Sequence, residues 1–167
     1  MDLDIGNFTP GDSVTVFSLH LPQKEAIIKF GVLICYDSVF PYVTREFVKN
    51  GAEFLVIITN DGWFGRTSGP YQHAQYAILR AIETRRWIAR CANTGISEFI
   101  DPYGRIVKRS RLYEPAVLSD QIEIRSDKTA FIKYGDIYQS VILILSAGIL
   151  LLSLMPFKWV FKRQSDG

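Results

Sequence analysis

The sequence predicts an α/β fold built on a mixed sheet. Residues 26–34 (AIIKFGVLI) and 53–59 (EFLVIIT) are continuous apolar runs, which are typical of strands buried on both faces of a layered fold. Each run is followed by a segment whose apolar residues recur every three or four positions, at residues 39–50 and 71–93. The order strand, helix, strand, helix, hairpin and last strand belongs to the α/β class.

A strand pair is expected near the N-terminus. Residues 1–25 are predicted to form an extended arm in which residues 14–19 (VTVFSL) have the alternation of a strand. The PQKE sequence at residues 22–25 is turn-forming. We therefore expect residues 14–19 to pair with residues 26–34 as a hairpin.

The rest of the sheet is expected to follow the long helix. Pro70 lies near the start of the helix predicted over residues 71–93. Residues 96–100 and 105–108 flank the sequence DPYG, in which Pro and Gly occupy suitable turn positions, so they are predicted to form a hairpin. Residues 116–124 supply the last predicted strand.

Composition excludes several classes of protein. The chain has 167 residues, enough for one domain with a core, and a formal net charge of +2, which gives no indication of nucleic-acid binding. Its two cysteines have no CxxC spacing and no neighbouring His or Cys cluster, so zinc and a disulfide framework are poorly supported and no cofactor is expected. The first twelve residues have no apolar core of the kind found in signal peptides.

One stretch near the C-terminus has a different composition. Residues 137–157 contain no charged side chain, and as a helix they would reach about 30 Å, the thickness of a bilayer's hydrocarbon core. The alternative is a buried core helix. Lys158, Trp159, Lys162 and Arg163 follow, and the positive-inside rule then places the tail at residues 158–167 in the cytoplasm and residues 1–136 outside.

The strongest candidate for chemistry is Cys35, at the end of the apolar run 26–34. Tyr36, Asp37 and Ser38 supply turn and helix-cap chemistry before the helix predicted at 39–50. A thiol on a sharp bend at the start of a helix faces the positive end of the helix dipole, which favours the nucleophilic thiolate. A buried structural cysteine is the alternative.

A second candidate follows the strand at 53–59. Asn60, Asp61, Trp63 and Phe64 belong to the loop NDGWFG. Trp63 and Phe64 either line a binding site or plug the core. Asn60 and Asp61 either organise the loop through side-chain-to-backbone hydrogen bonds or act directly on a substrate.

Two further residues of the predicted helix at 71–93 are expected to be structural. His73, near the helix start, is interpreted as a structural histidine, and Cys91 as part of the core. The charged side chains of this helix are expected to form a solvated or ion-paired face, with contact to anionic headgroups as an alternative: Arg80, Glu83, Arg85, Arg86 and Arg90.

These motifs resemble a known superfamily. ICYDSVFP, VIITNDGWFG, the segment HAQYAILRAIETRRWIARCANTGIS and the turn DPYGR are similar to the carbon–nitrogen hydrolases (nitrilases), and within them to the apolipoprotein N-acyltransferases, bacterial inner-membrane enzymes. The resemblance covers residue 8 to the C-terminus. The sequence YGD at residues 134–136, directly before the apolar stretch, separates the acyltransferases from their soluble relatives. The family resemblance implies a four-layer α-β-β-α sandwich and a Cys–Glu–Lys triad.

The resemblance assigns roles residue by residue. Cys35 matches the nucleophile, and Tyr36 the residue whose backbone N–H helps to hold the oxyanion. Asp37 stands where the acyltransferases usually have glutamate. The family's glutamate base and lysine lie upstream of the cysteine, and none of Lys24, Glu25 and Lys29 occurs in such a motif. The chain is therefore expected to be the C-terminal part of an enzyme and inactive alone.

The implied reaction moves an acyl chain from a phospholipid, through a thioester on Cys35, to the α-amine of a lipoprotein's diacylglyceryl-cysteine. The implied partners are these two substrates, the membrane and the missing N-terminal half, and the implied site is on the outer side of the bacterial inner membrane. Asn60, Asp61, Trp63 and Phe64 are the candidates for substrate contact. One alternative is a soluble-type nitrilase or amidase, which the apolar stretch at residues 137–157 disfavours. The other is a catalytically inactive membrane-anchored remnant, which the missing triad partners favour.

Overall fold

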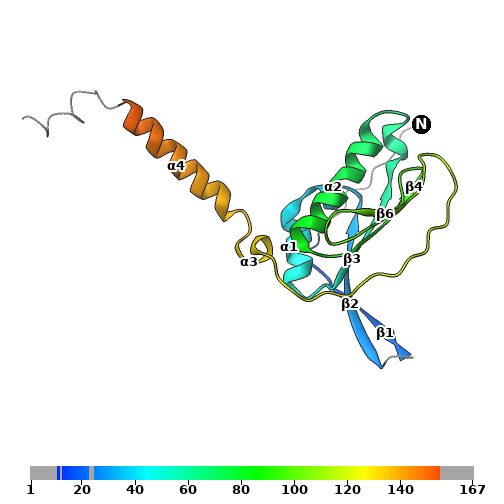
Figure 1. The fold of residues 1–167 in the computed structure, drawn as a ribbon. Helices are drawn as coiled ribbons and strands as arrows, with labels where there is room; N and C mark the ends of the chain where they lie inside the picture. Colours follow the sequence, from blue (N-terminus) through cyan, green and yellow to red (C-terminus); the bar gives the residue numbers. More distant parts are fainter. Residues whose placement is uncertain (1–10, 12, 23–24, 155–167) are drawn as a thin grey trace, which may run out of the picture. The chain divides into compact units, whose positions relative to one another are not determined.

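A computed structural model describes residues 11, 13–22 and 25–154 of the chain. Its described residues include one six-stranded mixed sheet whose spatial order equals the chain order (Figure 1). The three central strands run parallel and the outer ones antiparallel to their neighbours, as the predicted α/β class requires. The strands are β1 (Phe17–Leu21), β2 (Ala26–Ile34), β3 (Phe54–Asn60), β4 (Ile88–Asn93), β5 (Glu98–Ile100) and β6 (Ile106–Arg109).

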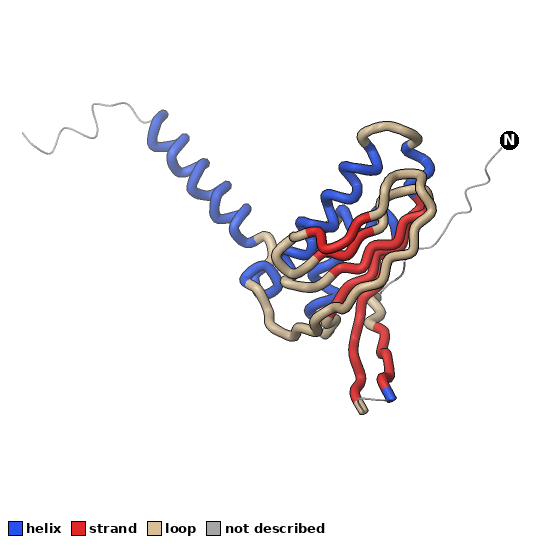
Figure 2. Tube along the Cα trace, turned by 45° about the vertical axis from the view of Figure 1, so that its right-hand side comes forward, coloured by secondary structure: helices blue, strands red, loops and turns tan. Residues whose placement is uncertain are grey.

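Two helices cover one face of this sheet (Figure 2). They are α1 (Pro41–Lys49) and α2 (Gly69–Thr84). Apolar side chains of β2 to β5 pack against these helices in a single core. The buried core residues include Leu33, Leu55, Ile57, Ile88 and Ile100 from the strands, and Phe47, Val48, Ala77 and Ala81 from the helices. Two short 3-10 turns, η2 (Cys35–Val39) and η3 (Asp61–Phe64), follow β2 and β3.

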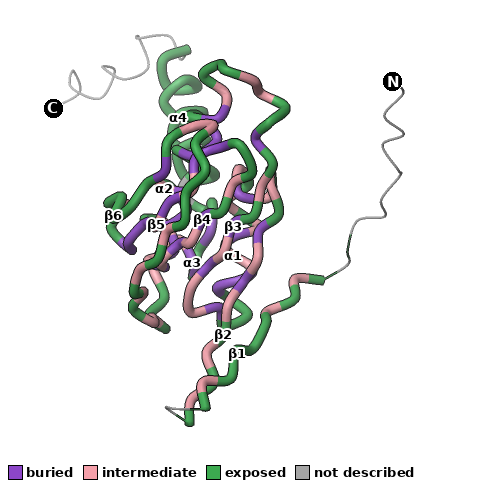
Figure 3. Tube along the Cα trace, turned by 90° about the vertical axis from the view of Figure 1, so that its right-hand side faces the viewer, coloured by how far each residue is buried: buried purple, intermediate pink, exposed green. Residues whose placement is uncertain are grey.

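The opposite face of the sheet is open in the described chain. Burial alternates along the strands, so that every second side chain of β2, β3 and β4 points away from the helices (Figure 3). Ile34, Ile58 and Cys91 are register partners on three adjacent strands, and all three are exposed. The strands were expected to be buried on both faces, and the structure buries only one.

The N-terminal hairpin is confirmed. β1 pairs antiparallel with β2, with Phe17 opposite Phe30. The ring of Phe30 stacks between those of Phe17 and Phe54, at centroid distances of 5.5 and 5.3 Å. This aromatic row ties the hairpin to the central strands. Residues 1–10 of the predicted extended arm lie outside the described residues.

The helix predicted over residues 71–93 is wrong in its second half. Helix α2 ends at Thr84, because Arg85 adopts a left-handed φ of 52° that stops the helix. Residues 88–93 form β4, which pairs in parallel with β3. Cys91, expected in the core, is exposed on the open face of this strand.

The predicted charged helix face is wrong for the residues beyond α2. Arg86 and Arg90 are almost fully buried, and only Arg80 and Glu83 form the expected ion pair on the helix, at 3.1 Å. Arg86 donates to the carbonyls of Ala52 and Asp127. This arginine therefore fixes backbone at the amino-terminal edge of the sheet.

The carboxyl-terminal part of the sheet is confirmed only to β6. The hairpin around DPYG forms β5 and β6, and Asp101 caps its turn by accepting hydrogen bonds from the N–H groups of Tyr103 and Arg105. The strand predicted at residues 116–124 is wrong, because these residues pair with no strand. The Lys108 ammonium instead donates to the carbonyl of Ser119 in this segment.

The chain divides into two units, Met1–Lys133 and Tyr134–Gly167. Between them runs α3 (Ala130–Tyr134), and the second unit contains α4 (Ile137–Leu154), whose leucines and isoleucines are exposed. Among the described residues, no helix combines the length and apolar character required to cross a membrane. The last three residues of the stretch 137–157 and the tail at 158–167 lie outside the described residues.

Candidate active site

Cys35 occupies a strained bend at the carboxyl end of β2. Its φ of 51° lies in the left-handed region, which side-chain-bearing residues adopt rarely and at a cost of about 1–3 kcal/mol. The bend is held locally, because the Ser38 hydroxyl donates to the Cys35 carbonyl at 2.9 Å. The thiol residue is half-buried. Helix α1 begins only at Pro41, after η2, so the expected direct contact of Cys35 with a helix start is replaced by a 3-10 turn.

The two residues after the cysteine differ in exposure. The Tyr36 ring is about half exposed and packs against His73 at a centroid distance of 5.5 Å. The Asp37 carboxylate accepts a hydrogen bond from the N–H of Ile34 at 3.0 Å, which holds the end of β2. Asp37 therefore has a structural role at the end of β2, in addition to the catalytic role that the motif assigns to it.

The NDGWFG loop separates its two aromatic residues. Trp63 is 70% exposed, whereas Phe64 is half-buried with its ring close to the Cα of Gly69 and edge-on to His73 at 5.9 Å. The Asn60 side chain accepts from the N–H of Gly62 at 3.1 Å, as expected for a residue that organises the loop. Of the two aromatics, Trp63 is the one that is available to a ligand.

Asp61 binds other side chains rather than the loop backbone. One carboxylate oxygen accepts from His73 Nδ1 at 2.8 Å and from the Thr59 hydroxyl at 3.1 Å, and the other accepts from Arg90 Nη2 at 2.7 Å. Asp61, His73 and Arg90, here called the Asp61 cluster, are each at most 3% exposed. The expected structural role of His73 agrees with this burial. The predicted substrate contact of Asp61 stays a prediction, because its carboxylate is engaged inside the chain.

The Asp61 cluster is charged despite its burial. Burial would raise the pKa of Asp61, but the hydrogen bond from His73 and the positive charge of Arg90 outweigh it and hold the pKa below its usual value. Glu98 lies next to this cluster, and burial raises its pKa, an effect that the ion pair with Arg109 at 2.8 Å offsets only in part. Asp61 is therefore an ionised carboxylate that balances the buried Arg90.

Sequence reasoning missed the Asp61 cluster because it placed Arg90 on the polar face of a helix. Residue types at 88–93 (IARCAN) do not alternate between apolar and polar, so the sequence carried no local signal for this strand. As a strand residue facing the helices, Arg90 points at Asp61 and also donates to the carbonyl of Ile96 at 3.1 Å.

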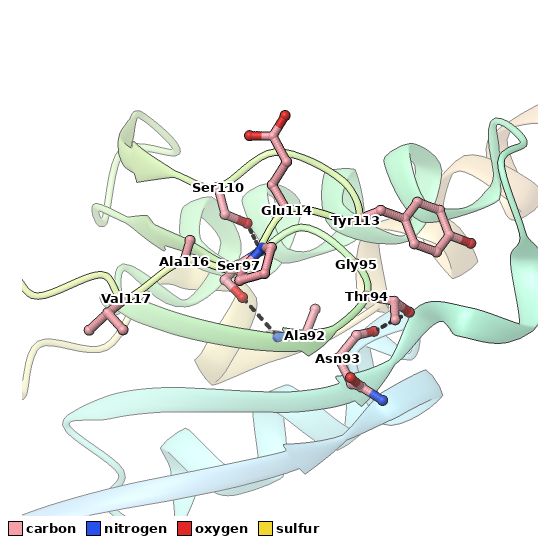
Figure 4. Close-up of a pocket in the computed structure, with 11 residues that line it drawn as sticks. Ala92, Asn93, Thr94, Gly95, Ser97, Ser110, Tyr113, Glu114, Ala116 and Val117 are labelled. Carbon is pink, nitrogen blue, oxygen red and sulfur yellow. Dashed lines mark hydrogen bonds between the residues drawn. The ribbon is translucent and has the colours of Figure 1, made fainter.

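A surface pocket of about 460 Å³ lies beyond the end of β4 (Figure 4). Its walls come from the β4–β5 connection and the segment after β6, including Asn93, Thr94, Ser97 and Tyr113. Several of its polar groups bind each other: Ser97 Oγ accepts from the N–H of Ala92 at 3.0 Å, and the N–H of Ser97 donates to Ser110 Oγ at 2.9 Å. None of the predicted site residues lines it.

The site also shows no metal-binding geometry. Within the part of the chain that the structure describes, no group of three or more His, Cys, Asp or Glu side chains is placed to hold a metal ion. Cys35 offers the chemistry of a thiol nucleophile.

Comparison with protein families identifies the class to which this fold and cysteine belong. Residues 5–128 match the carbon–nitrogen hydrolase family. The chain belongs to this family. The match contains the Cys35 bend, the NDGWFG loop and the Asp61 cluster.

Curated relatives of the chain include bacterial proteins named apolipoprotein N-acyltransferase. The chain is 38% identical to that of Geobacter metallireducens over 134 residues, 40% identical to that of Thermotoga maritima over 138 residues and 42% identical to the second such protein of Leptospira interrogans over 131 residues. These alignments cover 80, 81 and 76% of this chain but 25, 26 and 22% of the relatives. The chain thus spans about a quarter of the length of the relatives it matches.

Among solved structures, an amidase from Nesterenkonia sp. is similar in fold. It matches with a TM-score of 0.50 at 23% identity, over 65% of this chain and 41% of the amidase chain. This likeness confirms the nitrilase-superfamily α/β fold. It says nothing about the substrate.

Proposed function

We propose that this chain is the cysteine-bearing, carboxyl-terminal part of an apolipoprotein N-acyltransferase. The observation that carries this proposal is the half-buried Cys35 in a left-handed bend, inside a family match that includes relatives of that name at 38–42% identity. A thiol at such a bend reaches a substrate carbonyl with adjacent backbone N–H groups beside it, which is the arrangement that acyl transfer requires.

The proposed reaction has two steps. The Cys35 thiolate attacks the carbonyl carbon of a phospholipid acyl ester, and the ester C–O bond breaks, which leaves a thioester and a protonated lysophospholipid. The α-amine of a lipoprotein's diacylglyceryl-cysteine then attacks the thioester, so that an amide forms and the thiol of Cys35 is restored. The backbone N–H of Tyr36 stabilises the oxyanion in both steps. Trp63, which is 70% exposed, contacts the lipid substrates, and Asn60 shapes its loop through the hydrogen bond from the N–H of Gly62.

The open face of the sheet supports the involvement of further polypeptide. Ile34 and Ile58 are 62% and 44% exposed on this face, which is apolar and continuous over adjacent strands. An exposed apolar face of this kind marks an interaction surface. In the proposed enzyme a second sheet covers it and brings the family's glutamate base and lysine to Cys35.

The proposed enzyme lies in the bacterial inner membrane. Residues 1–136 form the catalytic part on the outer side, residues 137–157 the membrane helix and residues 158–167 the cytoplasmic tail. The sequence supports this proposal, because residues 137–157 contain no charged side chain and as one helix would extend about 30 Å at 1.5 Å per residue.

A thioester trap tests the proposal. The full chain is expressed in bacterial membranes together with the upstream three quarters of the Geobacter metallireducens relative, and phospholipid with a labelled acyl group is added. We expect hydroxylamine-sensitive label on this chain, none with Cys35→Ala, and unchanged label with Cys91→Ala as the matched control.

The same experiment distinguishes the alternatives. Label on the chain without the upstream part would overturn the expectation that the chain is inactive alone. Absence of label with the upstream part, in a complex that co-purifies, would overturn the proposed activity and favour an inactive remnant.

A further inference from the structure

The peptide group between Cys35 and Tyr36 is bound from inside the domain by a histidine. Its carbonyl oxygen lies 3.3 Å from His73 Nε2 and accepts a hydrogen bond from Ser38 Oγ at 2.9 Å. Because this peptide group is trans, its C=O and N–H point in opposite directions. Fixing the carbonyl toward buried His73 therefore fixes the Tyr36 N–H on the outward side.

From this geometry we infer that His73 is a positioning residue that aims the oxyanion donor of Tyr36, and that it does so as a doubly protonated imidazolium. The inference rests on the proposed function, because it assigns His73 a part in aligning that donor. Asp61 and Arg90 hold the His73 ring in place.

A hydrogen-bond acceptor lies beside each ring nitrogen of His73. Nδ1 donates to the Asp61 carboxylate, which only accepts when it is ionised. Nε2 faces Ser38 Oγ at 3.3 Å and the Cys35 carbonyl at 3.3 Å. Since the single Ser38 proton is used on the Cys35 carbonyl, both of these atoms present lone pairs to Nε2.

The titratable and charged groups that face His73 are Asp61 from η3, Arg90 from β4, and Cys35 and Tyr36 from η2. Arg90 Nη2 lies 3.5 Å from His73 Nδ1, and the Asp61 carboxylate accepts from Arg90 at 2.7 Å and from His73 at 2.8 Å. The Asp61 carboxylate therefore offsets the repulsion between Arg90 and a protonated His73.

The bend at Cys35 needs this support. A left-handed cysteine persists only where surrounding contacts over-determine it. Ser38 is a local contact within the same 3-10 turn, whereas His73 comes from α2 and is anchored to β3 and β4 through Asp61 and Arg90. His73 therefore ties the reactive turn to the rigid sheet.

The first test reads the charge state of His73 directly. The chain has two histidines, His20 and His73, so ¹⁵N-histidine NMR of the full chain needs only the His20→Gln variant for assignment. At pH 7 we expect protonated-type signals from both ring nitrogens of His73, which are the histidine signals that persist in His20→Gln. One unprotonated ring nitrogen on His73 would overturn the imidazolium assignment.

The second test measures whether His73 positions the N–H of Tyr36 for catalysis. In the thioester assay with the upstream part supplied, His73→Leu is expected to lower the acylation rate constant about 10²-fold with KM unchanged, the lower end of the loss of one oxyanion donor. His73→Gln, whose amide N–H reaches toward the position of Nε2, is expected to restore most of that rate. An unchanged rate in folded His73→Leu, or equal losses in both variants, would refute the positioning role.

The two tests distinguish a failure of the proposed acyl transfer from a failure of the His73 assignment. If the wild-type complex forms no thioester while the NMR spectrum shows the imidazolium, the proposed acyl transfer is wrong and the charge assignment stands. Folding of each variant is checked by the dispersion of its sheet amide signals, and His73→Gln keeps the test decisive if His73→Leu does not fold.

Discussion

Asp61 is a single buried carboxylate that holds several parts of the fold together. Its two oxygens bind three side chains from three different elements, so it connects the loop after β3 with α2 and β4. Its role was only partly predictable. The motif NDGWFG marked the residue, but its partners come from residues far apart in sequence, and a pattern of local spacing contains no information on such pairs.

Replacing Asp61 by Asn is expected to lower the free energy of unfolding by about 3–5 kcal/mol at pH 7, because Arg90 then remains buried without its counter-charge. Urea unfolding followed by tryptophan fluorescence measures this. The control is Glu114→Gln, which breaks an exposed ion pair of 3.7 Å with Arg111 and is expected to change stability by less than about 0.5 kcal/mol.

The stability loss caused by Asp61→Asn is expected to depend on pH. The pKa of Asp61 is lowered below its usual value of 3.8 in the folded chain, so its contribution to stability is fully present above pH 3.8 and is lost as the pH falls further. The difference between wild type and Asp61→Asn is therefore expected to be constant from pH 7 to about 5 and to shrink below pH 3.8. A difference that grows toward acid pH would contradict the assigned charge.

At the scale of elements, β2 and β3 were predictable and β4 was not. The two predicted strands are mostly apolar runs, with Lys29 as the one interior charge, and their assignment required no tertiary information. Strand β4 contains Arg90, which is unusual in a central strand, and its preceding residues continue the helical spacing of α2. What ends the helix is the left-handed Arg85, a conformation that its residue type does not indicate.

Helix α1 packs on β2 through a glycine, and this contact is testable. A Cβ on Gly31 would lie 2.5 Å from Cδ1 of Phe47, a core residue that is 7% exposed. Gly31→Ala is therefore expected to cost about 1–3 kcal/mol by overpacking. The measurement is again urea unfolding.

A double-mutant cycle supplies the control for this contact. Phe47→Ala removes Cδ1 and Cγ, the two atoms that the new methyl group would meet at 2.5 and 2.8 Å, so the double variant is expected to be more stable than the sum of the single effects by at least about 0.5 kcal/mol. Additive losses would mean that the helix and strand do not meet at these two residues.

At the scale of the whole molecule, the chain has two apolar surfaces: the open sheet face and α4. The sequence indicated both, through the half-sandwich implied by the family resemblance and through the charge-free stretch at 137–157. The open sheet face is part of the unit Met1–Lys133, whereas α4 belongs to the unit Tyr134–Gly167. Removing α4 therefore leaves the open sheet face intact, and the contribution of each surface to membrane association can be measured separately.

Ending the chain after Asp136 is expected to release it from membranes. This form keeps α3 and the contacts of Arg45 with the carbonyls of Phe131, Ile132 and Lys133, so the first unit retains its packing. We expect the full chain to resist extraction by alkaline carbonate and the shortened form to appear in the soluble fraction. Ala147→Lys, which puts a charge near the middle of residues 137–157 at a cost of about 2.5–3.5 kcal/mol in a bilayer, is the matched full-length control and should also weaken attachment. Equal retention of all three forms would assign membrane association to the open sheet face and refute the membrane role proposed for residues 137–157.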